Sequence, residues 1–239
     1  MIPRTALLMF LLVLLTACGR RDEYLDSLVE MEDRGYQGRQ VSQERIEEIK
    51  EAIRDYRKEV ARKVDATGQI GIYYKMLALE YMEAGMFQEA YEALQEAIAI
   101  HPENPILFYY SAVCAARISK AQVEEDPRQR WLELSERLYR RAIDLDPGYA
   151  DALYGLAILY VFELDRPEEA EVLLDRLLSI ESENIDAMFL LARLYYRTGR
   201  LEMALELYRK IAARSKVESK REEALADQRR VEEELYGVR

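Results

Sequence analysis

Apolar residues recur at spacings of three and four near the N-terminal end, which predicts one amphipathic helix over residues 41–70. We expect Ser42 to cap its first turn, and Thr67-Gly68 to stop it near Ala66. The apolar residues form a stripe along one face of this helix. The stripe is able either to cover the helix pair that follows or to form a coiled-coil dimer. It consists of Ile46, Ile49, Ile53, Tyr56, Val60 and Val64.

After this helix, one pattern of small, aromatic and turn-forming residues is repeated. In its first copy, Ala78 and Ala90 are small residues at which two helices can cross closely. Gly85 suits the turn between them, and Pro102 ends the second helix because it lacks an N–H. The pattern predicts four helix pairs, at residues 71–104, 105–149, 150–184 and 185–214.

These offsets resemble the tetratricopeptide repeat, a helix–turn–helix unit of about 34 residues. The resemblance implies an all-α, right-handed superhelical solenoid of about four helix pairs, with flanking N-terminal and C-terminal helices. The second unit departs from the pattern because its second half arrives late. The extra residues lie between Ser119 and Trp131, and we expect them to lengthen the turn inside that unit.

A charged segment follows the fourth unit. Ser219 and Glu222 form an S-x-x-E pattern typical of a helix start. A repeat array needs a terminal helix with a polar outer face. We therefore expect a C-terminal capping helix within residues 215–239.

The first residues resemble an export signal. Arg4 precedes an uncharged run over residues 6–17 that is too short to span a bilayer. The run ends in Leu15-Thr16-Ala17-Cys18, which resembles the lipobox of bacterial lipoproteins. The resemblance implies a signal peptide over residues 1–17, lipid such as palmitate on Cys18, and a lipidated tether over residues 18–40. Gly19 favours an outer-membrane lipoprotein that faces the periplasm.

Composition narrows the function classes. The formal net charge of −11 argues against a nucleic-acid partner. His101, Cys18 and Cys114 are the whole supply of His and Cys, too little for a His/Cys metal site or a His-based triad. The sequence also lacks a phosphate-binding loop. We therefore expect a protein that is not an enzyme and holds no cofactor or metal, with Cys114 buried as a small apolar residue.

The resemblance also implies a concave groove, built from fixed positions of the first helix in each unit. Aromatic residues with arginines are typical of a binding surface, although the same rings could serve only to pack neighbouring units. The implied groove residues are Tyr109, Val113, Arg117, Tyr154, Ile158, Phe162, Phe189, Arg193, Tyr196 and Arg197.

One well-known groove chemistry of the family does not fit. Its carboxylate clamp needs Lys and Asn in the first unit, and here Lys75 is followed by Leu79 at the Asn position. The groove residues are better suited to an apolar ligand, or to an amphipathic helix with acidic residues near its end.

Together these features predict a membrane-anchored scaffold of the bacterial cell envelope that binds a segment of a partner protein, in envelope or secretion assembly. The alternative is an accessory lipoprotein of a periplasmic solute-transport system, which binds a solute-binding protein or a hydrophobic ligand. A buried hydrophobic ligand or a stable trimer would favour the alternative, and the sequence leaves oligomerisation open.

Overall fold

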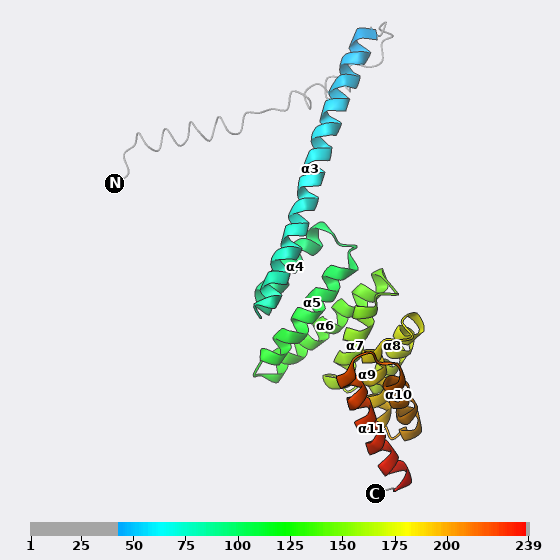
Figure 1. The fold of residues 1–239 in the computed structure, drawn as a ribbon. Helices are drawn as coiled ribbons and strands as arrows, with labels where there is room; N and C mark the ends of the chain where they lie inside the picture. The colour runs from blue at the N-terminus through cyan, green and yellow to red at the C-terminus, as the bar shows by residue number, and fades with distance from the viewer. Residues whose placement is uncertain (1–42, 238–239) are drawn as a thin grey trace, which may run out of the picture. The chain divides into compact units, whose positions relative to one another are not determined.

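The computed structural model describes residues 43–237, and every regular element in this range is a helix, α3 to α11 (Figure 1). The signal peptide, Cys18, the tether and the Ser42 cap lie outside the described residues. The chain divides into two compact structural units, which we call the first unit (residues 1–60) and the second unit (residues 61–239), as distinct from the repeat units. Between residues 43 and 237, no helix is both long and apolar enough to cross a membrane.

The first described helix, α3, runs from Gln43 to Glu83, so the expected stop at Thr67-Gly68 is wrong. The Thr67 hydroxyl donates to the Lys63 carbonyl at 3.0 Å, which satisfies this side chain inside the helix. The His101 ring nitrogen Nε2 lies 3.1 Å from the Gly68 carbonyl oxygen. A Cβ at Gly71 would lie 2.5 Å from the same ring. Gly71 therefore permits the close approach of His101, and neither glycine ends the helix.

The apolar stripe in the first unit is exposed. From Ile46 to Val60 its side chains are between 37% and 59% exposed, and Val64 in the second unit is also exposed. Covering of the following helix pair and a coiled-coil dimer both stay predictions for this stripe.

In the second unit, helices follow one another as pairs, which Figure 1 shows from cyan to red. The last part of α3 is followed by α4 (Phe87–Ile100). The next helices are α5 (Pro105–Ala121), α6 (Glu125–Leu145), α7 (Ala150–Phe162), α8 (Pro167–Ile180), α9 (Ile185–Arg197), α10 (Leu201–Arg214) and α11 (Glu218–Tyr236).

Small residues lie where the pattern predicts close helix crossings. Ala78 and Ala90 are fully buried in one apolar cluster with Leu94. A larger cluster extends from Ala112 through the remaining helix pairs to Val231 on α11. Gly85 ends the first turn with a φ of 74°, a conformation that favours glycine. The predicted all-α repeat fold is confirmed.

The extra residues of the second repeat unit lengthen its helices and not its turn, contrary to our expectation. α5 and α6 contain 17 and 21 residues, whereas α7 and α8 contain 13 and 14. Pro127 is tolerated because it lies in the first turn of α6. Lys120 and Arg128, from the two extended ends, each lie 3.0 Å from a Glu163 carboxylate oxygen beyond α7. The insertion therefore ties the second repeat unit to the third repeat unit.

The expected capping box at Ser219 and Glu222 is not formed. α11 begins at Glu218, and its N-cap residue Val217 makes no side-chain capping bond. Ser219 lies inside the first turn. The Ser215 hydroxyl instead accepts a hydrogen bond from the Val217 N–H at 3.2 Å.

Candidate partner-binding site

Helices α7, α9 and α11 line a cavity of about 220 Å³, which we call the terminal pocket. Three of its residues come from α7, four from α9 and two from α11. They are Tyr154, Ile158, Phe162, Asp186, Phe189, Leu190, Arg193, Lys220 and Glu223. The pocket thus brings together part of the groove predicted from the sequence.

The α7 wall of the pocket is apolar. Tyr154, Ile158 and Phe162 are four residues apart, so they lie on one face of the helix. Ile158 is 36% exposed and Phe162 is 58% exposed, whereas Leu156 and Leu159 on the other faces of α7 are buried. The exposed side chains are therefore available for an apolar contact with another molecule.

The charged groups of the pocket are paired with one another. Lys220 Nζ lies 2.6 Å from Asp186 Oδ1. The Arg193 guanidinium lies 2.5 Å from Glu223 Oε1 and 5.8 Å from the centroid of the Phe189 ring. The lining therefore carries balanced charge and does not by itself select an anion or a cation.

The aromatic residues of the pocket have different roles. Phe189 is buried, and its ring centroid lies 6.3 Å from that of Tyr208, so it mainly packs the core. Tyr154 is half-buried. Its burial, together with the Asp186 carboxylate, raises the pKa of its hydroxyl above the ordinary value, and the phenol is neutral at physiological pH.

The groove residues of the second repeat unit do not line this pocket. The Tyr109 ring packs against other tyrosines, with centroid distances of 5.2 Å to Tyr110 and 5.4 Å to Tyr149. Val113 is half-buried against the core. The Arg117 guanidinium lies 5.8 Å from the centroid of the Phe87 ring. Here the packing alternative describes the residues better than the binding one.

Tyr196 and Arg197 also make contacts inside the protein. A hydrogen bond with Glu234 on α11 raises the pKa of the Tyr196 hydroxyl. Arg197 donates to the Val161 carbonyl at 2.9 Å and to Asp165 at 3.1 Å. Arg117, Arg193 and Arg197, three of the implied groove residues, are each held by separate partners.

The α11 side of the pocket is not among the groove residues predicted from the sequence. Lys220 lies 34 residues after its partner Asp186, which is the spacing of one repeat. α11 therefore occupies the place of the first helix of a further unit. Extending the repeat count by one unit places Lys220 and Glu223 at groove positions, whereas the charge pattern alone indicates only a cap.

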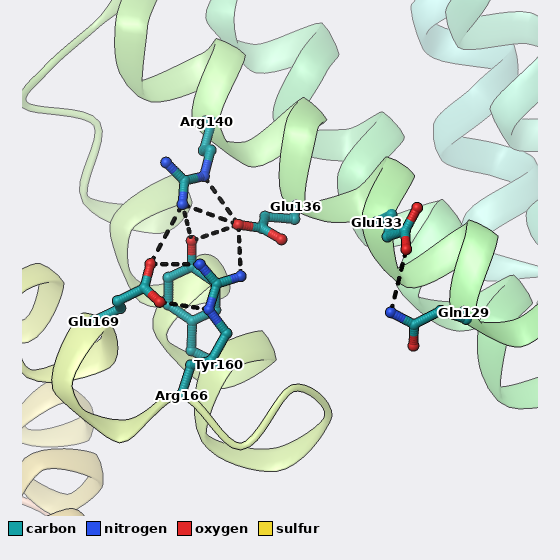
Figure 2. A network of polar contacts seen from close by, with 7 residues as sticks. All are labelled: Gln129, Glu133, Glu136, Arg140, Tyr160, Arg166 and Glu169. Atoms are coloured by element: carbon teal, nitrogen blue, oxygen red, sulfur yellow. Dashed lines mark hydrogen bonds and ion pairs between the residues drawn. The ribbon is translucent and has the colours of Figure 1, made fainter.

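A polar network joins α6, α7 and α8 (Figure 2). The Tyr160 hydroxyl donates to Glu136 at 2.9 Å and accepts from Arg140 at 2.8 Å. Arg166 donates to Glu136 at 2.9 Å and to Glu169 at 2.5 Å. Burial alone would raise the pKa of Glu136, but the hydrogen bonds from Tyr160, Arg140 and Arg166 outweigh it, and the pKa is lowered. The network stabilises the array.

Other reactive groups offer little chemistry. Cys114 is fully buried, and burial raises the pKa of its thiol to about 12. Within residues 43–237, no group of three His, Cys, Asp or Glu side chains is placed to hold a metal ion. A second cavity of about 160 Å³ is lined by Gly71, Ile72, Lys75, His101, Asn104 and Leu107.

Comparison with known families agrees with this architecture. Models of the tetratricopeptide repeat (TPR) match residues 71–104, 134–179 and 161–220, together about half of the chain. A TPR repeat-containing protein of Borreliella burgdorferi is 23% identical over 181 residues, which cover 76% of this chain and 79% of that protein. The TPR repeat-containing protein YpiA of Bacillus subtilis is 33% identical over 92 residues, 38% of this chain and 19% of YpiA.

Solved structures show the same fold. TTC0263, a thermophilic TPR protein of Thermus thermophilus, matches with a TM-score of 0.58 and 21% identity, covering 70% of this chain and 85% of that one. The structure of MamA matches with a TM-score of 0.52 and 21% identity, covering 75% and 90%. At these identities the likeness extends to the fold and not to a particular partner.

Proposed function

This chain belongs to the tetratricopeptide repeat family, and from this premise we propose that it is a membrane-anchored scaffold of the bacterial cell envelope. It binds a segment of a partner protein at the terminal pocket. A repeat array offers an extended surface for binding. We infer that the protein works through this surface and not through catalysis.

The observation that carries the proposal is the exposed apolar wall of α7 beside a charge-balanced rim. Ile158 and Phe162 expose apolar area next to the half-buried Tyr154. Removing such area from water is favourable by about 25 cal/mol per Å². A partner side chain seated there therefore gains contact without having to neutralise a net charge.

The chemistry of the pocket favours an amphipathic helix as the bound segment. A cavity of about 220 Å³ accommodates one or two apolar side chains, and a helix presents such side chains on one face at spacings of three and four. Arg193 is already paired with Glu223. The partner's apolar residues, and not an acidic end, are therefore expected to dominate its affinity.

The anchor is a separate part of the proposal. Leu15-Thr16-Ala17-Cys18 supports cleavage before Cys18 and attachment of lipid to it. Several acyl chains on one residue hold a protein stably on a membrane. Gly19 supports a position on the outer membrane, facing the periplasm. Radiolabelled palmitate should enter the wild-type chain and not Cys18→Ser, and labelling of both would contradict the anchor.

The pocket is tested by a matched pair of double variants in the full chain. Tyr154→Ala with Arg193→Ala removes one apolar wall residue and one rim residue of the pocket. Val172→Ala with Arg176→Ala likewise truncates one apolar and one arginine side chain, at exposed positions of α8. Partners are captured by crosslinking in native envelopes and identified by mass spectrometry.

We expect a defined set of envelope proteins to be crosslinked to the wild type and to the α8 variant and lost from the pocket variant. The helical circular dichroism signal should be the same in all three proteins. Equal capture by both variants would contradict the pocket as the binding site.

A further inference from the structure

The first helix of each inner pair has a face that is buried against the preceding pair. At the third and seventh positions of the unit, α5, α7 and α9 carry residues that are at most 3% exposed, namely Leu107, Ser111, Ala152, Leu156, Ala187 and Leu191. The equivalent residues of α3, Tyr73 and Leu77, are 64% and 42% exposed, because α3 is the first helix among the described residues.

Ile70, about one turn before Tyr73, is exposed as well. We call Ile70, Tyr73 and Leu77 the end face of the second unit. Large apolar side chains at positions that are covered in every inner pair indicate a surface made for a neighbouring helix. The question is which helix covers it.

The first unit contains a helical segment with a suitable pattern. Ile46, Ile49, Ile53, Tyr56 and Val60 alternate between spacings of three and four, which is the a and d pattern of a heptad repeat. Continuing this count along the sequence places Ile70 and Leu77 at d positions. Ile70 and Leu77 therefore share the heptad register of the first segment, with Tyr73 at the neighbouring g position, whereas Tyr74 at the a position packs against the core of its own chain.

We propose that the end face is covered by residues 43–60 of a second copy of this chain, running antiparallel to it. Ile46 of one copy then lies opposite Leu77 of the other, and Ile53 lies opposite Ile70. This alignment sets the a positions Ile46 and Ile53 opposite d positions, as antiparallel helix packing requires. By two-fold symmetry each copy gives one segment and receives one.

Charge complementarity selects the antiparallel alignment. It places Arg45 of one copy opposite Glu80 of the other. A parallel alignment would instead bring Arg45 against Lys50 at the flanking g and e positions, where like charges repel. Arg45 is paired with Glu48 on its own helix at 3.0 Å, so Glu80 would add a second carboxylate to an existing pair.

Site-specific crosslinking of full chains tests the arrangement. Two differently tagged copies are made in the same bacterial cells, one carrying Arg45→Cys and the other Glu80→Cys. A short thiol-to-thiol crosslinker is added to the isolated membranes. The matched pair for a parallel arrangement is Arg45→Cys with Lys50→Cys. Chains without an added cysteine give the background.

We expect the Arg45→Cys and Glu80→Cys pair to yield a mixed dimer severalfold more abundantly than the parallel pair. Leu77→Glu should abolish this dimer, because each of its two symmetric contacts would then bury a charged side chain. Val172→Glu introduces the same charge at an exposed apolar residue of α8 and should leave the dimer intact. Both sites are exposed in the single chain, so neither change should unfold it.

Three results from the dimer measurements would overturn the proposal. They are a dominant product from the parallel pair, an equal dimer yield from Leu77→Glu and Val172→Glu, and a wild-type protein that is monomeric by light scattering in detergent. A crosslink from Glu80→Cys to a different protein would assign the end face to that protein instead, and would also overturn it.

Discussion

Lys220 on α11 lies 2.6 Å from Asp186 on α9, and the two residues are 34 positions apart. The ion pair spans one repeat, which shows that α11 continues the array as if it began another unit. Lys220 and Glu223 of α11 complete the pocket that α7 and α9 begin.

Reversing the charge of Lys220 should weaken the attachment of α11. Lys220→Glu replaces a partly exposed attraction with a repulsion, and we expect a loss of about 1 kcal/mol in the free energy of unfolding. Combining it with Asp186→Lys restores an opposite-charge pair and should recover most of the loss. Urea unfolding of the four proteins measures this coupling. An additive double variant would contradict a direct interaction.

Two glycines of α3 should respond in opposite directions to alanine. A Cβ at Gly71 would lie 2.5 Å from the His101 ring, and we expect Gly71→Ala to destabilise the protein by at least about 1 kcal/mol. At Gly68 the nearest atom lies 3.9 Å away. Gly68→Ala should therefore stabilise the helix by up to about 1 kcal/mol. Thermal unfolding compares them, and stabilisation by both changes would show that the ring does not pack against α3.

Acid should weaken the protein partly through Glu136. Its pKa is lowered in the folded state, so it stabilises the fold above the ordinary value of 4.5, and this contribution is lost as pH falls through the lowered pKa. Glu136→Gln should reduce stability at neutral pH and make its dependence on pH below about 4.5 shallower. Glu133→Gln on the same helix lies outside the network and controls for the loss of one charge (Figure 2). Urea midpoints across this range measure the effect. Parallel curves for wild type and Glu136→Gln would contradict it.

The thiol of Cys114 should react only when the protein unfolds. It is fully buried, and its pKa is raised to about 12, so almost no thiolate forms at neutral pH. We expect iodoacetamide to leave Cys114 unmodified in the native protein and to modify it fully in urea, as measured by peptide mass spectrometry. Val123→Cys places a thiol at a fully exposed position and should react at once. Rapid native labelling of Cys114 would show that this part of the core opens readily.

The helix pairs could be predicted because their signals are local. Ala78, Ala90 and Gly85 repeat at offsets set by one helix–turn–helix unit, and each has the burial or backbone conformation that its position requires. The course of α3 past Thr67-Gly68 could not be predicted in this way. It depends on contacts with His101, which lies 33 residues after Gly68.

The candidate site also contains residues that the sequence predicts and residues whose contacts it does not predict. Tyr154, Ile158 and Arg193 follow from repeat positions, and the structure places them in one pocket. The intramolecular partners of Arg197 depend on a turn in which Asp165 adopts a positive φ of 46°. That turn changes the contacts without changing the repeat pattern, so repeat positions alone assigned Arg197 to the groove.

A photoreactive amino acid at Ile158 tests the central claim most directly. The full chain carries it either at Ile158 in the terminal pocket or at Val172 on α8, a more exposed apolar site. After irradiation of native membranes, we expect a discrete crosslinked partner from Ile158 and none from Val172. That product should disappear when Tyr154→Ala and Arg193→Ala are added. The same product from both positions, or its survival in the double variant, would contradict partner binding at this pocket.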